Sequence, residues 1–415
     1  MTLSRGRAWL VAVVATLAMS VSYVDRQVVS AIATSVRRGL AIDAEQFGYL
    51  ASAFSLAYLV AAPLAGALVD RVGARRGLLA AILVWSAVSA AHALAPSFAG
   101  LVILRILLGA AEAPSFPAAA QSVRRALPPG DRSAAFGLLF TGSSFGAAVA
   151  APLAIGLDLR FGWRTTFVLA SLVGLAWLPL WLVVTRAPHV RAALARPDAH
   201  PPAMSSPAPP VSFVSLLLDP AVLRALLLVL ASAAGLMFLF VWMPQYLELG
   251  RGLPKAEVAG YVWLPPVMGD LGMVGAGLLA SYLDRRKPPH RSHVTLVLVA
   301  GVLESTMVLV PWIGETWPAV AILGLSAAGG GALYTLLTAD MMARIDPARV
   351  SMAGGLTAAA QSLVYVIMNP VVGRWVDRTH SFDGPLVMLG MVALPGALLW
   401  ATIPVRRPAA INPAQ

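Results

Sequence analysis

The stretch GALVDRVGARR, residues 66–76, is a short charged turn between two long apolar runs. These runs cover 44–69 and 77–95, and a helix of about 20 apolar residues is enough to cross a bilayer. Gly66 allows two helices to approach closely, Asp70 can cap or pair at a neighbouring helix end, and Arg71 adds positive charge. The turn therefore predicts a pair of membrane spans joined on the cytoplasmic side.

The composition of the whole chain is that of a membrane protein. Its 415 residues are 59% hydrophobic and 12% charged, and its mean hydropathy is +0.78. Ordinary soluble domains carry about 25% charged residues, and no soluble core could hide this much apolar surface. The absence of cysteine excludes disulfides and thiolate metal sites. We expect an all-α integral membrane protein that crosses the bilayer many times.

Apolar runs separated by charged, glycine or proline clusters predict twelve spans. A Pro/Ala/Ser-rich stretch, ARPDAHPPAMSSPAPP, divides them into two sets of six. We expect a first six-helix bundle at 1–187, a cytoplasmic linker at 188–218 and a second bundle at 219–415. The predicted spans are 8–36, 44–69, 77–95, 98–126, 132–157, 165–185, 221–249, 256–283, 293–313, 317–343, 350–376 and 385–405.

The distribution of basic residues predicts the orientation. Nineteen of the 30 lysines and arginines fall on the side of the termini and the linker, and eight fall on the other side. The positive-inside rule then places both termini and the linker in the cytoplasm. This distribution also explains the net charge of +11 without a nucleic-acid partner, because most of the arginines lie in short turns.

The two halves carry similar sequences at equivalent spans. SAAFGLLFTGSSFGAAVAAPL (133–153) aligns without gaps on SMAGGLTAAAQSLVYVIMNPV (351–371), and six positions are identical. These stretches are the fifth and the eleventh predicted spans. The match predicts two pseudo-symmetric bundles with a ligand site near the middle of the membrane.

Together these features resemble the major facilitator superfamily over the whole chain. The spacing of 66–76 is similar to that family's signature loop, and the resemblance implies a gating motif that stabilises one conformation without touching substrate. SYVDRQVVS (22–30) and RILLGAAEAPSFPA (105–118) resemble the anion:cation symporter family, whereas 243–279 and 330–344 resemble bacterial hexuronate transporters. Galactonate-type relatives carry an acid at the position of Asp25. The gating motif then comprises Gly66, Asp70, Arg71, Gly73, Arg75 and Arg76.

Two acids and two bases lie inside predicted spans, Asp25 and Arg26 in the first and Arg105 and Glu112 in the fourth. A charge at the centre of a membrane helix costs about 2.5–3.5 kcal/mol on insertion scales, so such residues indicate function. Helix-end charges that reach for the interface are the alternative. We expect Arg26 to bind a substrate carboxylate, since its guanidinium matches that group. Arg105 would hold the acids, and Asp25 and Glu112 would carry coupled protons, as the galactonate-type resemblance also implies.

Several polar side chains are candidates for contacting substrate hydroxyl groups. Tyr23 lies three residues before Arg26 on the same helix face, although packing of its ring is an equal alternative. Asn369 precedes Pro370, so capping of a helix break competes with binding there. For Tyr58 and Asn369 the substrate contact is implied by the resemblance. The further candidates are Thr335, Thr338 and Gln361, while the roles of Asp270 and Glu304 are left open.

We therefore expect a proton-coupled symporter that imports a small organic anion, a hexuronate or aldonate, by alternating access. It would work as a monomer in a bacterial inner membrane, in contact with lipid, with the proton as coupling ion and no other cofactor. The alternatives are a carrier of another small carboxylate, an uncoupled anion uniporter, and a sensor that does not transport. We expect no enzyme, because the sequence holds no His-Glu-x-x-His motif and no phosphate-binding Gly-Lys-Ser/Thr motif.

Overall fold

A computed structural model of the chain describes residues 3–195, 213–284, 289–345 and 349–403. Every regular element in these ranges is a helix. Most of the predicted linker, 196–212, and the last part of the predicted second bundle, 404–415, lie outside the described residues. The helices pack into two compact units, unit 1 (Met1–Ser205, Phe240–Val267 and Val366–Ser381) and unit 2 (Ser206–Leu239, Met268–Tyr365 and Phe382–Gln415). The division of the sequence at 187 and 219 stays a prediction.

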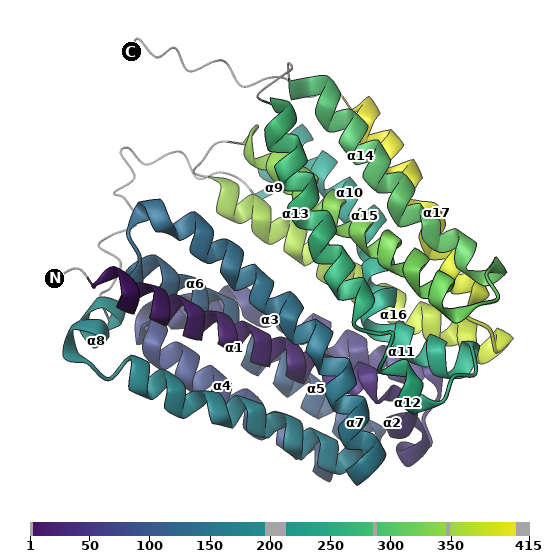
Figure 1. Cartoon of the computed structure of the whole chain (residues 1–415), viewed down its shortest axis with the longest axis horizontal. Helices are drawn as coiled ribbons and strands as arrows, with labels where there is room; N and C mark the ends of the chain where they lie inside the picture. The colour runs from purple at the N-terminus through teal and green to yellow at the C-terminus, as the bar shows by residue number, and fades with distance from the viewer. Residues whose placement is uncertain (1–2, 196–212, 285–288, 346–348, 404–415) are drawn as a thin grey trace. The chain divides into compact units, whose positions relative to one another are not determined.

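Unit 1 contains the helices of the first half of the chain and two pieces from the second half, Phe240–Val267 and Val366–Ser381 (Figure 1). Its elements are α1 (Arg5–Ala31), α2 (Ala33–Leu40), α3 (Ala44–Val72), α4 (Ala74–Ala91), η1 (His92–Leu94), α5 (Phe98–Glu112), α6 (Ser115–Ala126), α7 (Pro129–Val184), α8 (Pro188–Ala195), α11 (Met243–Gln245), η3 (Tyr246–Gly250) and α12 (Lys255–Val258), with the last part of α16 (Val350–Thr379).

Helices α1 and α7 pack closely along unit 1 because small residues line their contact. A methyl group built on Gly146 would lie 2.3 Å from the carbonyl oxygen of Ser20, and one on Gly142 would lie 2.5 Å from Thr16. Ser20 Oγ also donates to the carbonyl oxygen of Gly142 at 2.8 Å. Glycines four residues apart are a known means of bringing membrane helices together. This packing fixes α1, the helix that carries Asp25 and Arg26.

Unit 2 holds the longer helices of the second half. A short π-helical segment, η2 (Phe238–Trp242), joins its first long helix to the part of the chain that belongs to unit 1. Its elements are α9 (Phe213–Leu217), α10 (Pro220–Met237), α13 (Leu264–Asp284), α14 (Pro289–Ser305), η4 (Thr306–Trp312), α15 (Thr316–Met342), the first part of α16, and α17 (Asp383–Thr402).

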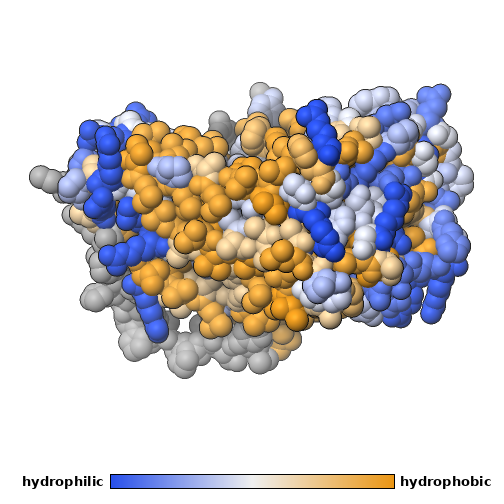
Figure 2. Space-filling model, turned by 90° about the horizontal axis from the view of Figure 1, so that it is seen from below, coloured by the Kyte–Doolittle hydropathy of each residue, from blue (hydrophilic) through white to orange (hydrophobic). Residues whose placement is uncertain are grey.

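The described helices agree with twelve membrane spans. Eleven stretches are long and apolar enough to cross a bilayer, and α7, at 56 residues, contains two of the predicted spans. Gly162 separates these two, with φ 77° and ψ 163°, a backbone conformation that glycine adopts readily. The surface agrees with this reading, since large apolar side chains are widely exposed. Figure 2 shows one face with apolar residues across its middle and hydrophilic residues towards both ends.

Candidate functional site

The side chain of Arg26 lies in an aromatic box in unit 1. Its guanidinium carbon is 4.8 Å from the ring centre of Tyr23, 4.9 Å from that of Phe54 and 4.8 Å from that of Tyr58. Tyr23 is on α1, and Phe54 and Tyr58 lie one turn apart on α3. Aromatic faces attract a cation, more strongly where water is excluded. The Arg26 side chain remains 24% exposed, so the box holds the cation without sealing it.

Glu112 is the anionic partner of Arg26. The Nε and Nη2 atoms of Arg26 donate to Glu112 Oε2 at 3.3 and 3.2 Å, and Ser22 Oγ donates to the same oxygen at 3.0 Å. Glu112 is fully buried. It is the last residue of α5, and Pro114, two residues later, separates α5 from α6 within the predicted span 98–126. Proline lacks the amide hydrogen that would continue the helical hydrogen bonds.

Gly109 brings α5 against α3 one turn before Glu112. A methyl group built on it would lie 2.5 Å from the carbonyl oxygen of Phe54 and 3.1 Å from the amide nitrogen of Tyr58. The bare glycine therefore allows the α3 backbone to pass next to α5. This close approach places the two aromatic rings beside the Arg26–Glu112 pair.

Asp25 occupies a separate position, because consecutive helical residues point about 100° apart. Ser89 Oγ, on α4, donates to Asp25 Oδ1 at 2.7 Å, and Asp25 is 1% exposed. Its Oδ2 atom has no hydrogen-bond partner among the described residues. Asp25 interacts electrostatically with Glu112 and with Arg105 but forms no ion pair with Arg26 or Arg105 in the described part of the chain.

Arg105 contacts a histidine rather than the acids. Its Nε donates to His92 Nε2 at 3.1 Å, and both side chains are buried. It forms no ion pair with Asp25 or Glu112 within the described ranges. We expected Arg105 to hold both acids, but the four charges are divided into the Arg26–Glu112 pair, an Asp25–Ser89 contact and an Arg105–His92 contact.

The sequence reasoning did not identify Ser22, Phe54, Ser89 or His92. Two of these had a helical signal, since Ser22 lies four residues before Arg26 and Phe54 four before Tyr58, and such residues share a face. Ser89 and His92 come from other helices, and no spacing within one helix could have found them.

The other predicted substrate contacts lie elsewhere. Asn369 is buried in unit 1, where its Oδ1 accepts from Trp242 Nε1 at 3.0 Å. Thr335 is in unit 2 and donates to the carbonyl oxygen of Met273 at 3.3 Å. Gln361 is also in unit 2 and has no hydrogen bond within the described residues. Substrate binding by these three residues stays a prediction.

The gating motif links the ends of four helices of unit 1. Gly73 joins α3 to α4 with φ 84°, a value that favours glycine. Asp70 Oδ1 accepts from Gln121 Nε2 of α6 at 2.7 Å, and Arg75 Nε donates to Thr185 Oγ1 at 2.9 Å. Arg71 and Arg76 are exposed. A methyl group built on Gly66 would meet no atom within 4 Å, so no close contact is seen at the position where we expected one.

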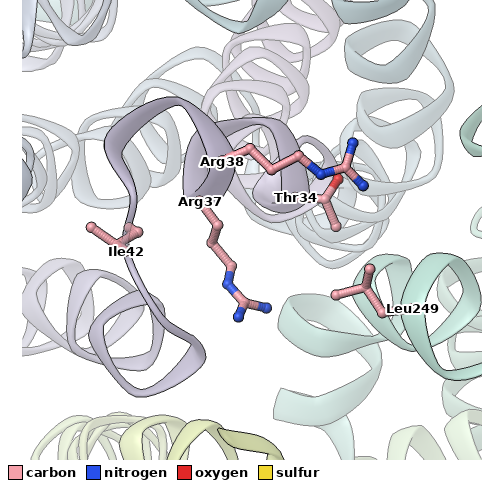
Figure 3. A pocket seen from close by; sticks show the side chains of 5 residues that line it. All are labelled: Thr34, Arg37, Arg38, Ile42 and Leu249. Carbon is pink, nitrogen blue, oxygen red and sulfur yellow. The ribbon is translucent and has the colours of Figure 1, made fainter. Parts of the chain in front are cut away.

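A second polar cluster in unit 1 lines an open pocket of about 270 Å³. Figure 3 shows Arg37, Arg38 and Thr34 around it, with Leu249 opposite. Glu248 accepts from Thr34 at 2.6 Å and from Arg38 at 3.2 Å. Arg37 donates to Gln245 at 2.9 Å, and burial lowers its pKa below the ordinary arginine value. Both guanidinium groups thus already have acceptors within the chain.

Comparison with known proteins agrees with the fold and the sequence resemblance. The family model described as Major Facilitator Superfamily matches residues 15–368. A hexuronate transporter of Bacillus subtilis (strain 168) is 29% identical over 407 residues, 96% of this chain and 94% of the relative. A D-galactonate transporter of Escherichia coli O6:H1 is 24% identical, with 94% of each chain covered. The likeness to hexuronate and galactonate transporters is therefore confirmed.

Among solved structures, a bacterial homologue of the human lysosomal transporter Spinster, in an inward-facing and unoccupied conformation, superposes with a TM-score of 0.74. The alignment covers 97% of this chain and 95% of that one, at 16% sequence identity. At this identity the likeness establishes the fold alone.

Proposed function

We propose, since this chain belongs to the Major Facilitator Superfamily, that it is a proton-coupled symporter that carries a sugar acid across the membrane. The similar proteins named above are transporters of hexuronate and D-galactonate, and others are named as probable galactarate/D-glucarate transporters. All of these substrates are small polyhydroxylated carboxylates. A carrier for them needs a fixed cation in its path, because a carboxylate leaving water must be paired.

The observation that supports this function most directly is the asymmetry of the Arg26–Glu112 pair. Glu112 is fully buried, whereas the Arg26 side chain remains 24% exposed. The partly exposed Arg26 side chain can receive a second carboxylate, and guanidinium–carboxylate pairs are frequently bidentate. We assign Arg26 as the residue that binds the substrate carboxylate, with the phenol groups of Tyr23 and Tyr58 beside it to accept or donate hydrogen bonds to substrate hydroxyls.

Coupling to protons follows from the same pair. When Glu112 is ionised, its negative charge already balances the positive charge of Arg26. A substrate anion bound at this position would then add a negative charge that no cation of the pair balances. Protonation of Glu112 leaves Arg26 with an unmatched charge that an anion can satisfy. Proton and anion therefore favour each other, and by linkage the effect is reciprocal. Asp25 would be the second acid of the cycle, held by Ser89, with Arg105 acting on both acids through space.

The remaining assignments come from the sequence. We propose alternating access by a monomer, both termini in the cytoplasm of a bacterial-type inner membrane, no cofactor besides the proton, and no enzymatic activity. The positive-inside distribution supports the orientation. The linker 188–218 would then be cytoplasmic as well.

Transport by purified protein in proteoliposomes tests the function. We expect an inward-directed proton gradient to drive accumulation of glucuronate or galactonate, and Glu112→Gln and Asp25→Asn to abolish this pH-driven accumulation. Arg160→Lys, a change at an exposed residue of α7, is the control. Full accumulation in both acid variants would refute the coupling scheme. Uptake that stops at equal concentrations inside and outside the liposomes at every pH would identify a uniporter. Uptake of acetate or lactate in preference to sugar acids would refute the substrate class.

A further inference from the structure

Glu304, at the end of α14, is a buried acid outside the site described above. It lies in unit 2 and is 3% exposed. Its Oε1 atom is wedged between two glycines, since a methyl group built on Gly235 of α10 would lie 3.1 Å from it and one on Gly330 of α15 would lie 3.2 Å from it. A methyl group on Gly329 would come within 2.3 Å of the Glu304 amide nitrogen. Glycines on two neighbouring helices thus leave room for this carboxyl group.

Neither carboxyl oxygen of Glu304 has a hydrogen-bond partner among the described residues. The serine beside it uses the backbone instead, because Ser326 Oγ donates to the carbonyl oxygen of Glu304 at 2.7 Å. The nearest side chain at Gly330 other than Glu304 itself is the apolar Leu236. The carboxyl group therefore lies beside two glycines, near the apolar side chain of Leu236, and without a hydrogen-bond donor from the described residues.

Among the described residues, no charged group forms an ion pair with Glu304 from the helices packed around it. Tyr334 of α15 lies four positions from Gly330, and the other ionisable residues of these helices lie ten or more positions along the chain from the level of Glu304, about 15 Å or more at 1.5 Å per residue. Arg224 and Asp340 pair with each other at 3.6 Å. Within the described residues neither base, His293 on α14 or Arg224 on α10, forms an ion pair with Glu304. The remaining members of this set are acids: Glu315 just before α15, Asp340 on α15 and Asp383 on α17.

The ligand that fits this position is a proton. An ionised carboxylate without a partner in such surroundings is far more costly than a neutral one. A hard metal cation would require several oxygen ligands, and the described residues contain no group of three or more His, Cys, Asp or Glu side chains that could hold a metal. Given the atoms that surround it, the Glu304 carboxylate can lose its negative charge only by binding a proton.

We propose that Glu304 is a further proton-binding site, located in unit 2, which holds a proton while α10, α14 and α15 are packed together and releases it when they separate. The proposal rests on the proton-coupled transport proposed above and adds a proton to those assigned to Asp25 and Glu112. Release requires the helices to part, because the carboxylate needs water once it is charged. The glycine contacts make such separation possible without moving large interlocked side chains.

The first test compares the number of protons moved per sugar acid by wild type, Glu304→Gln and Glu315→Gln in proteoliposomes. Glutamine keeps the shape of the side chain but cannot release a proton, and Glu315 is an exposed residue of the same unit. We expect Glu304→Gln to move one proton fewer per anion and Glu315→Gln to match wild type. An unchanged ratio in Glu304→Gln would overturn the proposal.

The second test needs no variant. Apolar carbodiimides react with protonated carboxyl groups inside membranes, so wild-type protein is treated with N,N′-dicyclohexylcarbodiimide over a range of pH and modification of Glu304 is measured by mass spectrometry. We expect modification that declines as pH rises. A Glu304 that stays unmodified at every pH would overturn the proposal, also where Glu304→Gln fails to fold. If wild type moves no protons at all, the proposed symport fails, while labelling still decides whether Glu304 binds a proton.

Discussion

Arg105 donates a hydrogen bond from Nε to Nε2 of His92, at 3.1 Å, inside the packed core of unit 1. The other ring nitrogen of His92, Nδ1, lies 2.8 Å from the carbonyl oxygen of Val88. A carbonyl can only accept, so Nδ1 carries the hydrogen and Nε2 is left as an acceptor. The histidine is therefore neutral in this arrangement, and its ring stacks on Phe167 with 5.0 Å between centres.

Replacing His92 with phenylalanine should destabilise the protein and impair transport. The ring would still pack on Phe167, but Arg105 would lose its acceptor, and an unsatisfied buried donor costs about 1–3 kcal/mol. His92→Gln, which can still accept a hydrogen bond, should lose less. Thermal melting in detergent, together with uptake assays, measures both effects. Equal melting temperatures for the two variants would show that the hydrogen bond to Arg105 contributes nothing.

Replacing Arg26 with lysine should weaken substrate binding although the charge is kept. Two nitrogens of Arg26 donate hydrogen bonds to one oxygen of Glu112, and its guanidinium lies among three aromatic rings. Lysine offers a single compact ammonium group instead. We expect about a tenfold or greater rise in the Kd for glucuronate or galactonate, which corresponds to about 1.4 kcal/mol. Titration calorimetry measures the change, with Arg160→Lys as the control. A Kd equal to that of wild type in Arg26→Lys would argue against Arg26 as the anion site.

Spacing within a helix predicted part of this site. Tyr23 and Arg26 share a face of α1, as their separation of three residues indicated. The pairing of Arg105 was not predictable in this way. Spacing tells which face of a helix a residue occupies, but the partner on another helix depends on how the helices pack. His92 accordingly takes the place where we expected the two acids.

The fold was more accessible from the sequence than the site was. A membrane span is recognised from the hydropathy averaged over about 20 residues. Because it is an average, one or two polar or helix-breaking residues do not change the result. The break at Ala113 and Pro114, inside a predicted span, shows the limit of such averages. The proline signal was present, but an apolar window that includes it still scores as one span. That break ends α5 at Glu112. Hydropathy averaged over a span does not report such a local break, although this break positions an acid.

Replacing Gly109 with valine should disrupt the aromatic box. Even a methyl group at this position would lie 2.5 Å from the Phe54 carbonyl oxygen, so α3 must move away from α5 and carry Phe54 and Tyr58 with it. Overpacking of this kind costs about 1–3 kcal/mol. We expect a lower melting temperature and a higher KM for the sugar acid.

Gly137→Ala is the matched control for this change. A methyl group at Gly137 meets no atom within 4 Å, and alanine in a helix is favoured over glycine by about 0.5–1 kcal/mol. Its melting temperature should be equal to or above that of wild type. If Gly109→Val melts at the wild-type temperature and keeps its KM, close packing at Gly109 does not position the box.

Replacing Lys255 with methionine should be strongly destabilising. Lys255 of α12 pairs with Asp158 of α7, and its ammonium group also donates to Ser35 Oγ at 2.6 Å. The two side chains are only 12% and 3% exposed. Removing one partner of a buried pair leaves the other charge uncompensated, at about 3–5 kcal/mol, whereas replacing both with apolar residues is often neutral.

We therefore expect Lys255→Met to lower the melting temperature clearly and Lys255→Met combined with Asp158→Leu to restore most of the loss. The exposed pair of Arg5 and Asp131, with Arg5 77% exposed, supplies the comparison, because such pairs contribute about 0–1 kcal/mol. Arg5→Met should then melt close to wild type. A Lys255→Met variant as stable as Arg5→Met would mean that α12 is not anchored to α7 by this pair, since burial is what makes the loss of one charge costly.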